Sequence, residues 1–123
     1  MDRERLEHLS KFIDVDDLMK RCFGRIDFAT LILGVLNDSC EADVCELEEA
    51  LTEANAQRVA KVSHRLKGAL ANSAAFSLSK KADELSTSAH DSSTSEMSER
   101  LVDLRREWDQ LAALINDQVT SKS

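Results

Sequence analysis

The amino-acid composition predicts an all-α protein. The chain of 123 residues contains no proline and only three glycines, and the residues that favour helices (Ala, Leu, Glu, Lys and Arg) dominate it. Apolar residues recur every three or four positions over long stretches, which is the period of an amphipathic helix. We therefore expect an antiparallel four-helix bundle with up-down-up-down topology, capped at one end by one or two short N-terminal helices.

A chain of this length has room for one hydrophobic core, so we expect a single domain over residues 1–123. Residues 1–25 are expected to form the capping helices, because two short apolar patterns precede Gly24. The bundle then spans residues 26–118, and residues 119–123 form a polar tail. The apolar residues of the capping segments are Leu6, Leu9, Phe12, Ile13, Leu18, Met19 and Phe23.

The first two bundle helices are expected to form a hairpin. Asp27 is the expected N-cap of a long helix that continues through Leu51. Asn55 is the expected N-cap of a second helix that ends near Asn72. The connection between the two helices is so short that they must run antiparallel and pack side by side.

The last two bundle helices follow a tight turn at Asn72-Ser73. One helix is expected to face inward from Phe76 onward and to end near His90. Ser93 and Glu96 have the spacing of a capping box, which predicts the start of the last helix. The apolar seam of that helix alternates in steps of four and three through Met97, Leu101, Leu104, Trp108, Leu111 and Ile115 and reaches Gln118.

Composition also restricts location and partners. No apolar run approaches the roughly 18 residues of a membrane span, and the polar N-terminus is unlike a secretory signal, so we expect a cytoplasmic protein without a membrane partner. The net charge of -7 argues against nucleic-acid binding. Cys22, Cys40 and Cys45 lack the spacing of a zinc site, so we expect reduced thiols and no resident metal or cofactor.

One histidine is predicted to lie on the exposed side of the second bundle helix. On a helical wheel with Val59 at zero, the apolar residues of this helix centre near 330°, whereas His64 lies at about 140°. The side chains expected around His64 are short or cationic, and Gly68, one turn later, lacks a Cβ that would obstruct a partner. These neighbours are Ala60, Lys61, Lys67, Gly68 and Ala71.

The charge around this histidine is expected to be locally basic. From Ala54 to Ala82 the sequence has six basic residues and no acidic one. Such a patch would attract an anionic group, and a neutral imidazole is a nucleophile. Lys67, three residues after His64, can hold phosphoryl oxygens. A phosphoryl group could therefore be accepted and passed on, while the metal and the remaining transfer machinery would come from the partner.

The segment His64-Arg65-Leu66-Lys67-Gly68 resembles the H-x-x-K-G signature of histidine-containing phosphotransfer (HPt) domains. The similarity extends from about Asp14 through Leu114 in the order of the helices. It implies that His64 is the phospho-accepting residue, that Lys67 interacts with the phosphoryl group and that Gly68 gives a receiver domain access. One departure is Ala74, which stands where many members have glycine in the turn after this helix.

The resemblance implies a phosphorelay intermediate rather than an enzyme with its own kinase or ATP-binding activity. The expected partners are response-regulator receiver domains, which supply Mg²⁺, and a hybrid sensor histidine kinase. Ala60, Lys61, Arg65 and Ala71 are the expected partner-binding residues around His64. The N-terminal apolar face could close the bundle or make a dimer contact. We expect it to close the bundle of a monomer, because a monomer leaves His64 free.

Two other functions remain open on the sequence. A sensor-kinase dimerisation domain also carries its phosphorylated histidine in a helical bundle, but that family resembles H-E-x-x-x-P. Here Arg65 follows the histidine, and the chain lacks proline. The second alternative is a helical docking module that binds a receiver domain or kinase without phosphorylation. Uptake of a phosphoryl group by His64 distinguishes this module from a phosphorelay intermediate.

Overall fold

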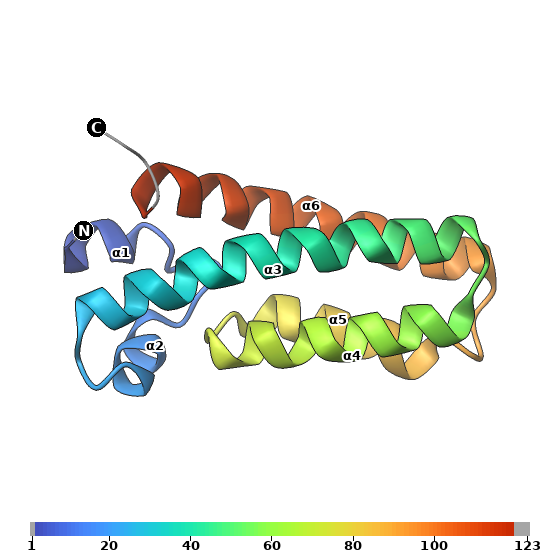
Figure 1. Cartoon of the computed structure of the whole chain (residues 1–123), viewed down its shortest axis with the longest axis horizontal. Coiled ribbons are helices and arrows are strands. Elements are labelled where there is room, and N and C mark those ends of the chain that lie inside the picture. Colours follow the sequence, from blue (N-terminus) through green and yellow to red (C-terminus); the bar gives the residue numbers. More distant parts are fainter. Residues whose placement is uncertain (1, 120–123) are drawn as a thin grey trace.

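The computed structural model describes residues 2–119, which contain six helices and no strand (Figure 1). The N-terminal segment forms two short helices, and the other four are longer. The polar tail expected at residues 119–123 lies outside the described residues from position 120 onward. The helices are α1 (Arg3–Glu7), α2 (Val15–Arg21), α3 (Ile26–Thr52), α4 (Ala56–Asn72), α5 (Phe76–Ser88) and α6 (Thr94–Gln118).

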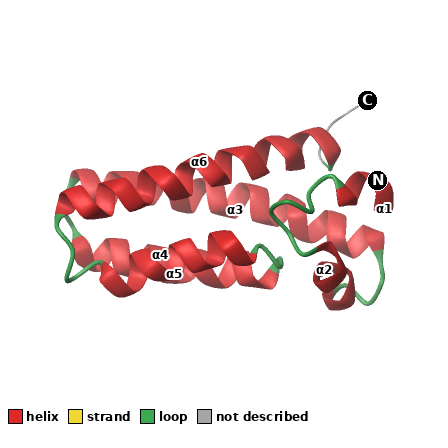
Figure 2. Ribbon diagram, turned by 180° about the vertical axis from the view of Figure 1, so that it is seen from behind, coloured by secondary structure: helices red, strands yellow, loops and turns green. Residues whose placement is uncertain are grey.

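The four long helices form the expected antiparallel bundle. Helix α3 packs against α4 and α6, and α5 packs against the same two helices, so the four helices enclose one core. Short connections join consecutive helices at opposite ends of the bundle (Figure 2). The chain therefore runs up-down-up-down, as predicted. No helix in the described residues is long and apolar enough to cross a membrane.

The N-terminal helices cover one end of this bundle, as the sequence predicted. Leu6 and Leu18 are fully buried and belong to the common core. The backbone N–H of Asp14 donates to the carbonyl oxygen of Ala74 at 2.9 Å, which joins the segment before α2 to the turn between α4 and α5. The Arg5 guanidinium donates to the carbonyl oxygen of Asp117 at 3.1 Å and so joins α1 to the end of α6.

Two of the predicted N-caps are confirmed, and a third is wrong. The side chain of Asn55 accepts the backbone N–H of Arg58 at 3.0 Å, and Ser93 and Glu96 form a complete capping box. Helix α3, however, begins at Ile26 with Arg25 as its N-cap, not at Asp27. Asp27 lies in the first turn and forms an ion pair with Arg25 at 2.7 Å, a position that also suits the positive end of the helix dipole.

Helix α5 differs from its prediction at its first residue. Phe76 does not face the core, since its side chain is 45% exposed, and the guanidinium of Arg21 lies over its ring at 5.9 Å. The helix ends at Ser88, two residues before His90, which is exposed. The inward positions between these ends agree with the predicted pattern. They are Leu78, Ala82 and Leu85, with Ala89 buried just beyond the helix.

The apolar seam predicted for α6 forms the wall of the core opposite α4 and α5. Trp108 is almost completely buried, and its indole N–H donates to Oε1 of Glu41 on α3 at 3.0 Å. This hydrogen bond satisfies the only polar atom of the side chain, so the ring can pack in the core without an unpaired donor. The buried seam residues are Met97, Leu101, Leu104, Trp108, Leu111 and Ile115.

Ala74 keeps the turn geometry for which glycine is favoured. Its φ is +59°, in the left-handed region that costs an L-residue with a Cβ about 1–2 kcal/mol. The next backbone N–H, that of Ala75, donates to the carbonyl oxygen of Leu70 at 2.9 Å and closes the end of α4. The alanine therefore strains this turn without opening it.

The three cysteines are free, and we expect only Cys45 to react in the folded protein. Burial raises the pKa of Cys40 to about 12, and burial also raises the pKa of Cys22. Cys45 is exposed, although a hydrogen bond to Glu41 raises its pKa. Because a thiol reacts as its thiolate, a disulfide reagent at pH 8 is expected to modify one thiol slowly in native protein and three in denaturant. Rapid native modification of two or three thiols, or of a Cys45→Ser variant, would contradict this burial pattern.

Candidate functional site

Helix α4 presents a buried face and an exposed face, and His64 lies on the exposed one. The buried face consists of Val59, Val62, Ser63, Leu66 and Leu70. His64 is exposed, which agrees with its predicted place on the wheel opposite the apolar arc. The helix forms here because Asn55 caps its N-terminus and the sequence is rich in alanine, leucine, lysine and arginine.

The imidazole of His64 is available to a partner molecule. No hydrogen bond or ion pair within residues 2–119 involves its side chain, so neither ring nitrogen is engaged by this part of the chain. The preceding residue, Ser63, is buried, and its hydroxyl donates to the carbonyl oxygens of Val59 and Ala60 at 2.6 and 3.2 Å. Ser63 therefore holds the inner side of this turn, while His64 projects outward.

The surface around His64 is low, which means that residues with little or no side chain lie beside the imidazole. Gly68 is exposed, Ala60 and Ala71 are partly exposed, and a Cβ added at Gly68 would meet no atom within 4 Å. The packing of the chain therefore does not require glycine at position 68. The same is true of Gly34 in α3, so open space alone does not identify a site. What distinguishes Gly68 is its position one turn after His64, on the same side of α4.

Lys67 is engaged by a carboxylate that the sequence prediction did not include. Its ammonium lies 3.1 Å from Oδ1 of Asp83 on α5, and both side chains are partly exposed. Two further contacts align the helices, because Ser79 donates to the carbonyl oxygen of Lys67 at 3.0 Å and Ser86 to that of Ala60 at 3.2 Å. The spacing of Ser79, Asp83 and Ser86 is that of one helix face, which is the signal that could have indicated Asp83.

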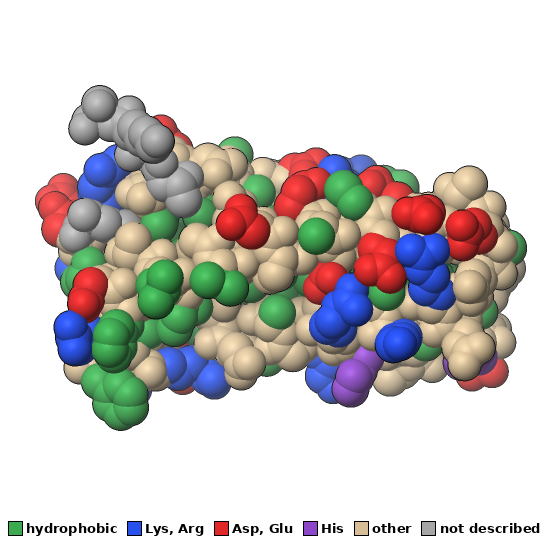
Figure 3. Space-filling model, viewed as in Figure 1, with side chains coloured by type: hydrophobic (Ala, Val, Ile, Leu, Met, Phe, Trp, Pro, Cys, Tyr) green, Lys and Arg blue, Asp and Glu red, His purple; other side chains and the backbone are tan. Residues whose placement is uncertain are grey.

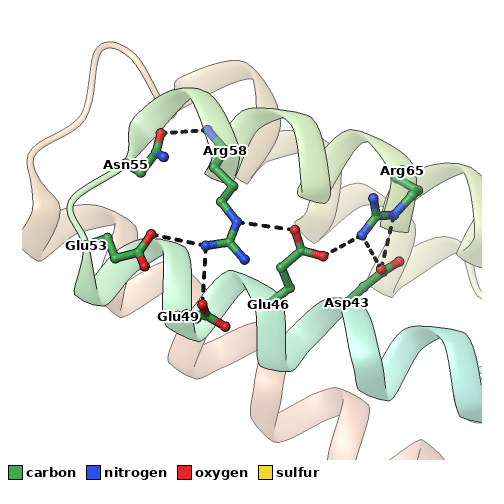
Figure 4. A network of polar contacts seen from close by, with 7 residues as sticks. All are labelled: Asp43, Glu46, Glu49, Glu53, Asn55, Arg58 and Arg65. Carbon is green, nitrogen blue, oxygen red and sulfur yellow. Dashed lines mark hydrogen bonds and ion pairs between the residues drawn. The ribbon is translucent and has the colours of Figure 1, made fainter.

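Arg65 points toward α3 (Figure 4). Its guanidinium donates to Oδ1 of the buried Asp43 at 2.7 and 3.1 Å and to Glu46 at 2.9 Å. Glu46 also accepts from Arg58 at 3.3 Å, so one carboxylate joins two arginines of α4. Hydrogen bonds from Arg65 and then Arg58 hold the pKa of Glu46 below its usual value. Arg65 was predicted to contact a partner, yet its hydrogen bonds in this structure join α4 to α3.

The basic character expected for the α4 and α5 hairpin is largely neutralised. Four of its six cations form ion pairs with carboxylates of α3, α5, α6 or the loop before α4, which the sequence count left out. Red carboxylates accordingly lie among the blue cations over α3 and α4 in Figure 3. Within the described residues, Lys61 and Lys80 form no ion pair, and Lys61 is exposed one turn before His64. The paired cations are Arg58, Arg65, Lys67 and Lys81.

The site therefore combines a free imidazole, a cation on either side of it and a low surface. Lys61 and Lys67 lie three residues before and after His64, so both can approach an anionic group on the ring. No cluster of three or more His, Cys, Asp or Glu residues within positions 2–119 is arranged to hold a metal ion. The arrangement is suited to accepting an anionic group on the histidine from a second molecule.

One known protein family matches most of the chain. The family model described as Hpt domain matches residues 32–116, which is more than half of the chain and includes His64, Lys67 and Gly68. No curated protein and no solved structure matches the chain significantly. Members of the matched family carry out histidine phosphotransfer in two-component signalling, and the helical bundle is the fold of that family. The chain belongs to the Hpt domain family.

Proposed function

We propose that the protein is a phosphorelay intermediate in which His64 accepts a phosphoryl group from the aspartate of one receiver domain and passes it to another. The observation that carries this proposal is the exposed, unengaged imidazole of His64 in the H-x-x-K-G segment within the family match. His8 and His90 are also exposed, so exposure alone does not select the residue. His64 is followed by both lysine and glycine at the third and fourth positions, whereas His8 is followed by Lys11 and then Phe12.

In the proposed transfer, the ring nitrogen without a hydrogen attacks the phosphorus atom of the receiver's aspartyl phosphate. A P–N bond forms, and the P–O bond to the receiver breaks with its electron pair, which restores the aspartate. The other ring nitrogen keeps its hydrogen, so the step needs no further proton acceptor. Transfer to the second receiver is the reverse reaction. The chain supplies the nucleophile and the nearby lysines, while the receiver supplies Mg²⁺, and no kinase activity of its own is required.

The surface of the molecule supports a protein partner rather than a small molecule. Large apolar side chains are exposed over the turn after α2 and the first half of α3. The face that carries them also carries Lys and Arg side chains (Figure 3). Exposed apolar groups of this size are typical of surfaces that another protein covers. The exposed side chains are Phe23, Phe28, Leu31 and Val35. We propose receiver domains and a hybrid sensor histidine kinase as partners of a monomer.

A docking module that binds a receiver without phosphorylation is the second candidate. It is favoured by one observation, namely that Asp83 engages the ammonium of Lys67 and would compete with a phosphoryl group for this cation. The two functions differ in whether a covalent bond forms at all.

The deciding experiment measures the transfer of label to the wild-type protein. The protein is incubated, in the presence of Mg²⁺, with a receiver domain that carries a labelled aspartyl phosphate. We expect label on the protein that is lost in acid and stable in base, as a P–N bond requires. Calorimetry with the same unphosphorylated receivers measures binding separately. Folded protein that binds receivers but takes no label from any of them would overturn the relay and leave the docking module.

A further inference from the structure

Asp83 lies level with His64 across the contact between α4 and α5. The hydroxyls of Ser79 and Ser86 donate to the carbonyl oxygens of Lys67 and Ala60, respectively. Because the two helices are antiparallel, residues between Ser79 and Ser86 lie opposite residues between Lys67 and Ala60. Asp83 therefore lies opposite the turn that contains His64, and its carboxylate reaches the Lys67 ammonium at 3.1 Å.

A phosphoryl group on His64 would compete with this carboxylate. Residues three apart on a helix have Cβ atoms about 5–6 Å apart, so the Lys67 ammonium can reach either Asp83 or a phosphoryl oxygen on His64. Both groups are anionic, and the pair is partly exposed, so the ammonium can exchange between them without a buried charge being left alone. Phosphorylation would thus either draw Lys67 away from Asp83 or force the two anions to share it.

Two other charged groups nearby have separate partners. Arg65 is held by Asp43 and Glu46 on α3, and Glu84, the residue after Asp83, faces Arg100 on α6 at 3.6 Å. In the described residues, Lys61 and Lys80 form no ion pair, and Lys67 is the lysine whose ammonium lies beside Asp83. Asp83 is therefore the carboxylate that acts on the lysine of the H-x-x-K-G segment.

We propose that Asp83 is a positioning residue that acts through Lys67 and raises the phosphoryl-transfer potential of phosphorylated His64. The inference rests on the proposed phosphorelay function and deepens it. In the unphosphorylated protein, Asp83 holds Lys67 beside the site. In the phosphorylated protein, it withdraws part of the ammonium's charge from the phosphoryl group, so transfer onward to a receiver is favoured.

The test compares Asp83→Asn with Glu84→Gln, which removes the same charge from the next position of α5. At equilibrium with a labelled receiver and Mg²⁺, Asp83→Asn is expected to shift the distribution toward phosphorylated His64 about fivefold, and Glu84→Gln by less than about twofold. Asp83→Glu keeps the negative charge, so its distribution of phosphoryl group between receiver and His64 is expected to equal that of the wild type. Circular dichroism and thermal melting establish that each variant is folded.

A double-variant cycle tests whether Asp83 acts through the lysine. In a Lys67→Gln background, adding Asp83→Asn is expected to shift the equilibrium by less than about twofold, because the shared ammonium is gone. An undiminished shift in that background would mean direct repulsion and would overturn the positioning role. The inference also fails if Asp83→Asn has no effect or if Glu84→Gln has an equal one.

A second readout separates this inference from the proposed function. Phosphoramidate can phosphorylate a histidine without a receiver, and the rate of hydrolysis of the product reports the stability of the P–N bond. We expect slower hydrolysis in Asp83→Asn than in the wild type or in Glu84→Gln. If no receiver labels the wild type, the relay fails. The hydrolysis rates still decide whether Asp83 acts on a phosphoryl group at His64, and equal rates would overturn it.

Discussion

Replacement of His64 by glutamine is expected to reduce phosphoryl uptake from a receiver domain to background without disturbing the fold. Glutamine has no nitrogen that can form the P–N bond. The His64 side chain is exposed and makes no hydrogen bond or ion pair within the described residues, so its loss leaves no buried group without a partner. The free energy of unfolding should therefore change by no more than about 0.5 kcal/mol. Labelling and urea denaturation of the same preparation measure the two quantities.

The other two histidines provide matched controls for this substitution. His8 and His90 are exposed like His64, but neither is followed by lysine and glycine at the third and fourth positions. His8→Gln and His90→Gln should retain full labelling. Label that persists in His64→Gln, or that disappears in either control, would place the phosphorylated residue elsewhere in the chain.

The features that the sequence predicted correctly depend on short-range pattern. The exposure of His64 follows from the position of the apolar residues on its own helix. The caps at Asn55 and Ser93 each involve a backbone N–H three residues later, so they can be recognised within four residues of sequence. The bundle topology follows from such helices and from the short connections between them.

The features that the sequence did not predict depend on which helices lie side by side. The ion pairs of Lys67 with Asp83 and of Arg65 with Asp43 join residues 16 and 22 positions apart, and they form only in one register of the packed helices. A count of charges along the hairpin therefore overestimated its basicity, because the acidic partners lie outside the counted segment. The misplaced N-cap at Asp27 has a local cause, since Arg25 adopts the extended conformation of a cap without a side-chain cap bond.

Replacement of Gly68 is expected to stabilise the fold and impair phosphoryl transfer at the same time. A Cβ at this position meets no atom within 4 Å, and glycine in a helix costs about 0.5–1 kcal/mol relative to alanine. Gly68→Ala should therefore raise the free energy of unfolding by about that amount. Gly68→Gln, with a longer side chain, is expected to lower the rate of transfer from a receiver about 100-fold, because a displacement of about 1 Å in the approach of the reacting groups can cost that much.

Gly34 supplies the comparison that separates the two effects. It is also a helical glycine with open space around it, but it lies on α3 nine residues before Asp43, the residue that Arg65 of α4 contacts. Nine residues of helix correspond to about 14 Å. Gly34→Ala should give the same gain in stability, and it leaves the surface beside His64 unchanged. If Gly68→Gln transfers as fast as the wild type, the low surface beside His64 is not where the receiver approaches. If Gly68→Ala is less stable than the wild type, the glycine has a role in the fold that the open space around it does not reveal. The expected result is a more stable protein that transfers more slowly. It would mean that glycine at position 68 lowers the stability of the free protein and is useful only when a partner approaches His64.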